Sequence, residues 1–128
     1  MSARLCLIRD FVALAKTDVA AGDGTKLRYH SLGRRVLRAV AKELGLQSGT
    51  YDIRSNLGGI AVLGEVILHG EHLYIQFCEA MNGTEVLYRT CQGRKDYGGG
   101  VNHWMGYEDL YDIKRACEKF KVVANGSL

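Results

Sequence analysis

The sequence predicts one α+β domain over residues 1–128, with a four-stranded antiparallel meander at about residues 50–91, two helices before it and one after it. Three observations lead to this prediction. Apolar residues recur at helical spacing in the first third of the chain and again near its end. Between those parts the apolar period changes to two, which is typical of strands. Glycine-containing pairs then divide that region into four pieces.

The size and composition suit one globular domain. The 128 residues can bury a core without disulfides, and 47% hydrophobic and 24% charged residues are ordinary for such a domain. Arg9 and Asp10 interrupt the N-terminal apolar run too early for a secretion signal, and no apolar stretch reaches the roughly 20 residues of a membrane span. We therefore expect a cytoplasmic protein with no membrane contact, whose cysteines are reduced.

Two helices are expected before the meander. The first covers residues 3–16, where apolar side chains recur on one stripe: Leu5, Ile8, Val12 and Ala15. The second covers residues 31–44, because Ser31 is a good N-cap, Gly45 is a good C-cap and the apolar residues between them share one face. A turn at Gly22-Asp23-Gly24 separates the two helices.

Two-residue hairpin turns are expected at three pairs: Gly58-Gly59, Gly70-Glu71 and Asn82-Gly83. They give strands at residues 50–57, 60–69, 72–80 and 84–91. Because two-residue turns also fix the register between strands, they predict which residues share a face. One face of this sheet is apolar and contains the row Ile53, Gly64, Phe77 and Tyr88.

The opposite face of the predicted meander mixes apolar and charged residues. One row contains Asp52, Glu65, Gln76 and Arg89, and the neighbouring rows contain Leu63, Ile67, Tyr74 and Leu87. Large exposed apolar patches usually mark an interface. We therefore expect a helix, a ligand or a second copy of the chain to cover this face, and a two-fold homodimer is the predicted assembly.

The last helix is expected at about residues 107–121, where one stripe contains Leu110, Ile113, Cys117 and Phe120. Acidic residues lie in its first turn and basic residues in its second half, as the helix dipole favours. Stability accounts for these features, so we assign this helix no chemistry.

The second helix is strongly basic and carries Arg34, Arg35, Arg38 and Lys42. With a helix start at Ser31, Arg34 and Arg35 would lie beside the free N–H groups of the first turn, an arrangement that attracts anions such as phosphate. The alternative is a solvated surface whose charges aid solubility. Nucleic acid stays open as a partner, although this helix lacks the Asn, Gln or aromatic residues that read bases.

A long glycine-rich loop is expected at residues 92–106. Gly98-Gly99-Gly100 would act as a hinge, flanked by candidate ligand contacts at Arg94, Lys95, Tyr97, His103 and Trp104. Long loops in compact domains tend to be functional, but the same composition describes a mobile connector. We expect the free loop to be mobile, and Trp104 to be accessible to solvent until a ligand binds.

A catalytic alternative depends on the polar row of the sheet. Two directly opposed carboxylates repel, so Asp52 and Glu65 would share a proton or a cation and act as general acid and base. Arg89 would orient an anionic substrate, and His103 would line the pocket. The other interpretation is an ordinary surface network in which Arg54 and Arg89 neutralise the acids.

His69 and His72 should face each other across the Gly70-Glu71 turn, but no third ligand is evident, and we predict neither a metal nor a cofactor. The leading hypothesis is a non-enzymatic, homodimeric binding protein that engages an anionic ligand or partner through residues 31–44 and 92–106. A small enzyme using Asp52 and Glu65, and a purely structural interaction module, are the alternatives.

Overall fold

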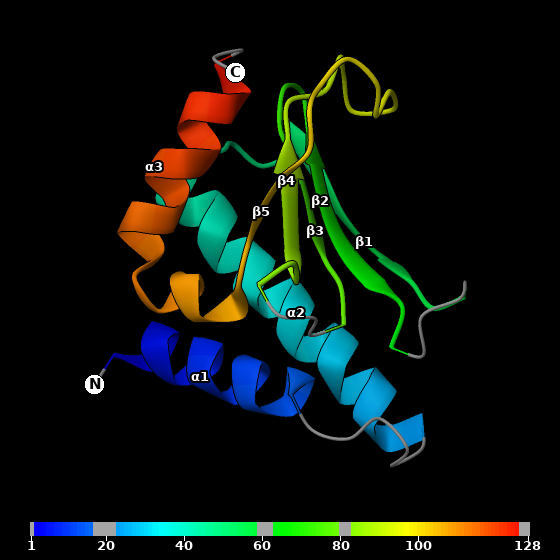
Figure 1. Ribbon diagram of the computed structural model, residues 1–128, viewed down its shortest axis with the longest axis vertical. Coiled ribbons are helices and arrows are strands. Elements are labelled where there is room, and N and C mark those ends of the chain that lie inside the picture. The colour runs from blue at the N-terminus through cyan, green and yellow to red at the C-terminus, as the bar shows by residue number, and fades with distance from the viewer. Residues whose placement is uncertain (1, 17–22, 59–62, 80–82, 126–128) are drawn as a thin grey trace.

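The computed structural model describes residues 2–16, 23–58, 63–79 and 83–125 (Figure 1). Within them it contains three α-helices, a 3₁₀ helix and an antiparallel sheet of five strands, in the order β1-β2-β3-β4-β5. The predicted α+β class is confirmed, with one strand more than predicted. None of the described helices is both long and apolar enough to span a membrane.

The elements follow one another as α1 (Ala3–Ala15), α2 (Asp23–Leu44), β1 (Tyr51–Asn56), β2 (Glu65–Gly70), β3 (Tyr74–Phe77), β4 (Val86–Arg89), β5 (His103–Met105), the 3₁₀ helix η2 (Tyr107–Tyr111) and α3 (Ile113–Ala124). The three α-helices lie on one side of the sheet, as Figure 1 shows. Helices α2 and α3 pack on the strands, and α1 packs on α2 and η2. We call the helix-covered side the inner face and the other side the outer face.

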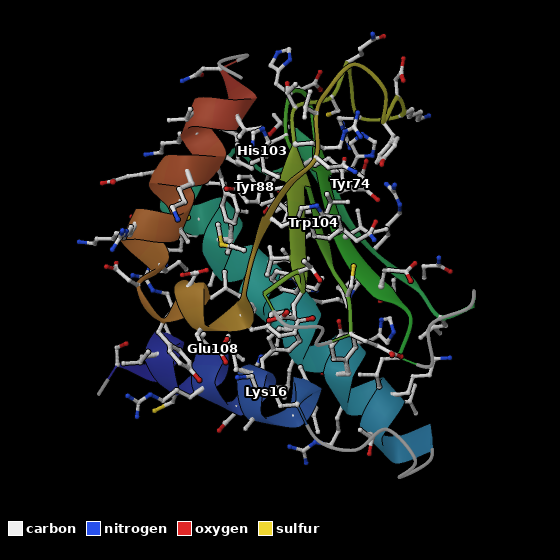
Figure 2. The ribbon with its side chains drawn as sticks, viewed as in Figure 1. Lys16, Tyr74, Tyr88, His103, Trp104 and Glu108 are labelled. Carbon is white, nitrogen blue, oxygen red and sulfur yellow. The ribbon has the colours of Figure 1, made fainter. Side chains whose placement is uncertain are left out.

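The core lies between the inner face and the helices. Its helical part includes Phe11, Val36, Leu37 and Phe120, and its sheet part includes Val66, Leu68, Ile75, Phe77 and Val86, all of them no more than 1% exposed. An ion pair between Lys16 and Glu108 also joins the end of α1 to η2 (Figure 2). Both the first and the last helix therefore contribute to the core.

Helix α1 has the predicted bounds within one residue, and Ser2 caps it by accepting a hydrogen bond from the Leu5 N–H at 3.0 Å. Helix α2 begins at Asp23, so the prediction of a start at Ser31 is wrong. Burial helps to hold the additional turns, since Tyr29 is fully buried. Gly45 ends the helix as predicted, with a φ of +73° and an N–H donated to the Lys42 carbonyl.

The predicted register of the sheet is wrong, although the predicted faces are right. Ile53 pairs with Leu68 instead of Gly64, Phe77 pairs with Val66, and Tyr88 pairs with Ile75. The pairings are displaced by four residues between β1 and β2 and by two in the other two pairs. Since side chains alternate with a period of two, even displacements leave the side chains within the strands on their predicted faces.

Connections that differ in length or position from the predicted turns explain the displaced register. Residues 57–64 connect β1 with β2, residues 71–73 connect β2 with β3, and residues 78–85 connect β3 with β4. The second connection closes with the Gly70 N–H donating to the Leu73 carbonyl at 2.8 Å. The predicted turns at Gly58-Gly59 and Asn82-Gly83 lie partly outside the described residues. The register between the flanking strands is not the one that a two-residue turn at either place would give.

The predicted single helix at residues 107–121 is two helices. Asp112 has non-helical backbone angles, and its side chain accepts a hydrogen bond from the Arg115 N–H at 3.2 Å, which caps α3. The predicted stripe is nevertheless buried, with Leu110 in η2 and Ile113, Cys117 and Phe120 in α3.

The outer face has its own small apolar cluster of Ile67, Tyr74, Leu87 and Cys91, each 4–6% exposed. Leu63, which was predicted on this face, belongs to the main core instead. The chain itself covers the cluster, in part through Tyr97, whose ring packs edge-on against Tyr74 at 4.9 Å. The homodimer therefore stays a prediction, without the exposed apolar surface on which it was based.

Candidate functional site

The segment between β4 and β5 lies over the outer face and is fixed there by hydrogen bonds. Arg94 donates to the Gly49 carbonyl at 2.7 Å and to Asp52 Oδ1 at 2.9 Å. On β4, Arg89 donates to the Gly100 carbonyl at 2.7 Å and to Asn102 Oδ1 at 2.8 Å. These bonds attach both ends of the segment to the sheet.

The glycines of this segment meet geometric requirements of the bound backbone. Gly99 has a φ of +92°, and a Cβ at Gly100 would lie only 2.3 Å from the Thr90 carbonyl oxygen. Gly98 accepts a hydrogen bond from the Gln92 N–H at 3.1 Å. The backbone of Gly99 and the close approach of Gly100 to Thr90 explain these two glycines without a hinge. The mobility of the free loop remains a prediction.

An open pocket of about 550 Å³ lies where this segment meets strands β1 and β2. It is lined by Asp52, Ile53, Arg54, His69, Arg94, Lys95 and Tyr97. Three of these side chains are permanently cationic and one is a carboxylate. The excess of positive charge makes the pocket the candidate site.

His69 links the cations of the pocket to the loop backbone. Its ring is 2% exposed, with Nδ1 3.3 Å from both terminal nitrogens of Arg54 and Nε2 2.7 Å from the Gly93 carbonyl. A guanidinium group can only donate, so Nδ1 accepts and Nε2 carries the hydrogen. His69 is therefore a neutral ring in this arrangement. It orients Arg54 without cancelling its charge.

Asp52 is the counter-ion of Arg94. The hydrogen bond from Arg94 is the main cause that lowers the pKa of the Asp52 carboxyl below its ordinary value of 3.8, and the charge of Arg54 acts in the same direction. Asp52 is thus ionised at neutral pH. It positions Arg94 and is poorly suited to act as a general acid.

The predicted carboxylate pair does not form. Asp52 pairs with His69 on β2, while Glu65 pairs with Asn56 at the other end of β1 and accepts a hydrogen bond from its amide at 2.8 Å. The register displacement of four residues is the physical reason. His69 likewise faces Tyr74 instead of His72. Within the described residues, no group of three or more His, Cys, Asp or Glu residues is arranged to hold a metal ion.

A series of ring contacts connects β4 with the pocket. The Arg89 guanidinium lies 4.2 Å from the centre of the Tyr97 ring, Tyr97 packs edge-on against Tyr74, and Tyr74 packs edge-on against His69 at 5.1 Å. Arg89 is 8% exposed and its donors are directed at the loop backbone and Asn102. Arg89, which was predicted to contact the ligand, is therefore placed to position the loop.

His103 and Trp104 lie on opposite faces of β5, a strand that the sequence did not predict. His103 stacks on Tyr88 on the inner face at 5.4 Å, whereas Trp104 is on the outer face with 45% of its surface exposed (Figure 2). The two side chains point in opposite directions because β5 pairs with β4 and neighbouring strand residues alternate between the faces of the sheet. His103 also lies outside the pocket.

The basic residues of α2 form a separate surface. They lie in the middle of the helix, so the predicted first-turn anion site at Arg34 and Arg35 is wrong. Arg34 donates to Ser55 Oγ at 3.5 Å, and Arg38 is exposed. Arg35 and Lys42 line another open pocket, of about 530 Å³, next to Arg4 of α1. The helix and the loop do not form one site, since α2 packs on the inner face.

In comparisons with protein families, curated proteins and solved structures, the chain matches none significantly. The site must therefore be interpreted from its own chemistry. The structure brings the predicted residues Asp52, Arg94, Lys95 and Tyr97 together. It also places Arg54 and His69 in the pocket. From the sequence, Arg54 was considered only as a counter-ion and His69 only as a metal ligand.

Proposed function

We propose that the protein is a non-enzymatic binding protein that takes an anionic ligand in the pocket formed by Arg54, Arg94, Lys95 and Tyr97. The single observation that carries this proposal is the charge of the pocket. Arg94 is paired with Asp52, but no ion pair with a carboxylate is found for Arg54 or Lys95 among the described residues. Their charges are available to an anion that enters from solvent.

Preorganisation supports the proposal. Arg94 is held by both Gly49 and Asp52, and Arg54 is held by the neutral His69 ring. A ligand that binds these groups gives up less side-chain entropy than one that binds free arginines.

Binding is favoured over catalysis. The acid and base pair on which the enzyme hypothesis depended is not assembled, and Asp52 is occupied by Arg94. His69 uses both ring nitrogens in structural hydrogen bonds. These groups are accordingly assigned to positioning in the proposal, and the cations are assigned to binding.

The proposal can be tested with tripolyphosphate as the probe, added to ¹⁵N-labelled protein and followed by NMR. The expected result is saturable shifts of the amide signals of residues 52–54 and 93–97. Arg54→Gln should weaken binding, whereas Arg115→Gln, which removes the same charge from the exposed surface of α3, should leave it unchanged.

A third variant separates the pocket from the helix surface. If Arg38→Gln weakens tripolyphosphate binding and Arg54→Gln does not, the anion binds at α2 and the proposal is wrong. Equal effects of Arg54→Gln and Arg115→Gln would also contradict it, since they would report net charge alone. Circular dichroism of each variant checks that the fold is retained.

A further inference from the structure

One row of side chains crosses the outer face of all five strands. Strand pairing places Arg54, Ile67, Gln76, Leu87 and Trp104 side by side in this row. Arg54 and Trp104 are exposed at its two ends, Gln76 is half-buried, and Ile67 and Leu87 form its apolar floor. With strands about 4.8 Å apart, the row spans roughly 19 Å. We call it the transverse row.

Trp104 is the unusual member of the transverse row. Its indole is 45% exposed although its backbone is paired with β4, so the ring stands at a defined place on the surface. Tyr97 is exposed to the same extent, and its ring is fixed by Arg89 and Tyr74. Trp104 and Tyr97 thus present aromatic surface that core packing does not use.

The two rings are near enough for one extended ligand. Tyr97 lies over Arg89, and Trp104 lies beside Leu87, which is two residues from Arg89 on the same face of β4. Two residues along a strand and one strand across correspond to a separation on the order of 8 Å. Arg54 and Lys95 border the same surface from the pocket.

We infer that single-stranded nucleic acid binds across this outer face, with bases stacked on Trp104 and Tyr97 and phosphates at Arg54 and Lys95. The inference rests on the proposed anion site and names its ligand class. Stacking on exposed aromatic rings beside cations is how proteins hold unpaired bases.

A single strand fits this surface better than a duplex does. The stacked bases of a duplex leave no flat ring surface for Trp104 or Tyr97, and the outer face bears no helix that could enter a groove. A small inorganic anion would use the pocket but would leave the aromatic rings without a role. The surface therefore favours a ligand that is both flat and charged.

The probe is a labelled oligothymidylate of about ten nucleotides, a length within the usual site size for such surfaces. Trp104 is the only tryptophan of the chain, so its emission reports directly on the transverse row. Oligothymidylate should quench this emission and protect it from iodide. Trp104→Leu and Tyr97→Leu should each weaken binding by roughly 5- to 150-fold, which corresponds to the loss of one stacked base.

Tyr111→Leu is the matched control, because Tyr111 is exposed to a similar extent, 41%, but lies on η2. It should leave the affinity unchanged. Arg54→Gln should lower the salt dependence, reducing the slope of log K against log salt concentration by about 0.7 for one lost phosphate contact. All three aromatic variants alter exposed side chains and should keep the wild-type circular dichroism.

The outcomes separate the inference from the proposed function. If tripolyphosphate binds at Arg54 but oligothymidylate neither quenches Trp104 nor responds to Trp104→Leu, the inference is overturned and the anion site stands. If neither probe binds, the proposed function is overturned as well. If duplex DNA of the same length binds as tightly as the single strand and with the same response to Trp104→Leu, the assignment to single strands is wrong.

Discussion

Replacing Gly64 with alanine should destabilise the protein about 1–3 kcal/mol more than the same change at Gly45. The two glycines have almost the same left-handed backbone, with φ values of +76° and +73°. A Cβ in that conformation costs roughly 1–2 kcal/mol at either position. Alanine also restricts the unfolded chain equally in both variants, so this effect cancels in the comparison. The surroundings of the added methyl group must account for any difference.

Those surroundings differ sharply. Nothing lies within 4 Å of the Cβ position at Gly45, whereas at Gly64 the Asn56 carbonyl oxygen would be 2.1 Å away and His30 Nε2 3.3 Å away. Real Cβ contacts exceed 3.0 Å, so the backbone at residue 56 or 64 must move by about 0.9 Å. His30 limits this movement, because its Nε2 is hydrogen-bonded to the Leu63 carbonyl at 2.6 Å. Overpacking of this kind typically costs 1–3 kcal/mol.

Urea unfolding followed by far-UV circular dichroism measures both free energies. Gly45→Ala should lower the stability by about 1–2 kcal/mol and Gly64→Ala by about 2–5 kcal/mol, with unchanged denaturant slopes. Equal losses would refute the reasoning. They would mean that the β1–β2 connection does not pass as close to Asn56 as the structure places it.

Three further predictions concern protonation and thiol reactivity. The NMR titration midpoint of Asp52 should lie below 3.8 and should rise toward that value in Arg94→Gln. Because the folded-state pKa of Asp52 is depressed, the Asp52–Arg94 pair stabilises the fold fully above the unfolded-state pKa. This stabilisation is lost as the pH falls through the folded-state pKa. Long-range ¹H–¹⁵N NMR should find His69 as the Nε2–H tautomer, and an Nδ1–H ring would contradict its hydrogen bond with Arg54. Iodoacetamide should modify the exposed Cys6 first and Cys117 last, as read by mass spectrometry, because burial raises the pKa of the Cys117 thiol to about 12.

Alternation alone was enough to predict the faces of the sheet. Ile53, Phe77 and Tyr88 all lie on the inner face, as their period of two indicated. The partners across the strands depend instead on turn lengths, and these are set by contacts that no local pattern reveals. Between β2 and β3, for example, the Gly70 N–H donates to the carbonyl of the buried Leu73, which places the turn at residues 71–72 instead of 70–71.

Two other elements escaped prediction for the same reason. The early turns of α2 are favoured by burial of Tyr29, which is not visible as a periodic pattern. Strand β5 has three residues, too few to show an alternation, and it follows a glycine-rich segment. Tertiary pairing with β4, not local propensity, makes it a strand.

The candidate site was partly accessible from the sequence. Lys95 and Tyr97 could be recognised by type, and Asp52 and Arg54 could be placed on one face by alternation. What could not be predicted was the path of the segment after β4, which depends on long-range hydrogen bonds such as Arg94 to Gly49 and His69 to Gly93. That path decides which of these residues meet.

The structure also separates cations that the sequence could only group together. Arg89 directs its donors at Gly100 and Asn102, and Arg94 is paired with Asp52, so both are engaged within the chain. Arg54 is held by a neutral ring, and Lys95 is exposed. A ligand gains most from charges that are positioned but not neutralised, because it then displaces no internal ion pair. The buried Arg89 of β4 therefore serves to present the exposed cations, and substitutions at Arg54 and Arg89 should differ in kind. Substitution of Arg54 weakens ligand binding, and substitution of Arg89 loosens the surface that binds the ligand.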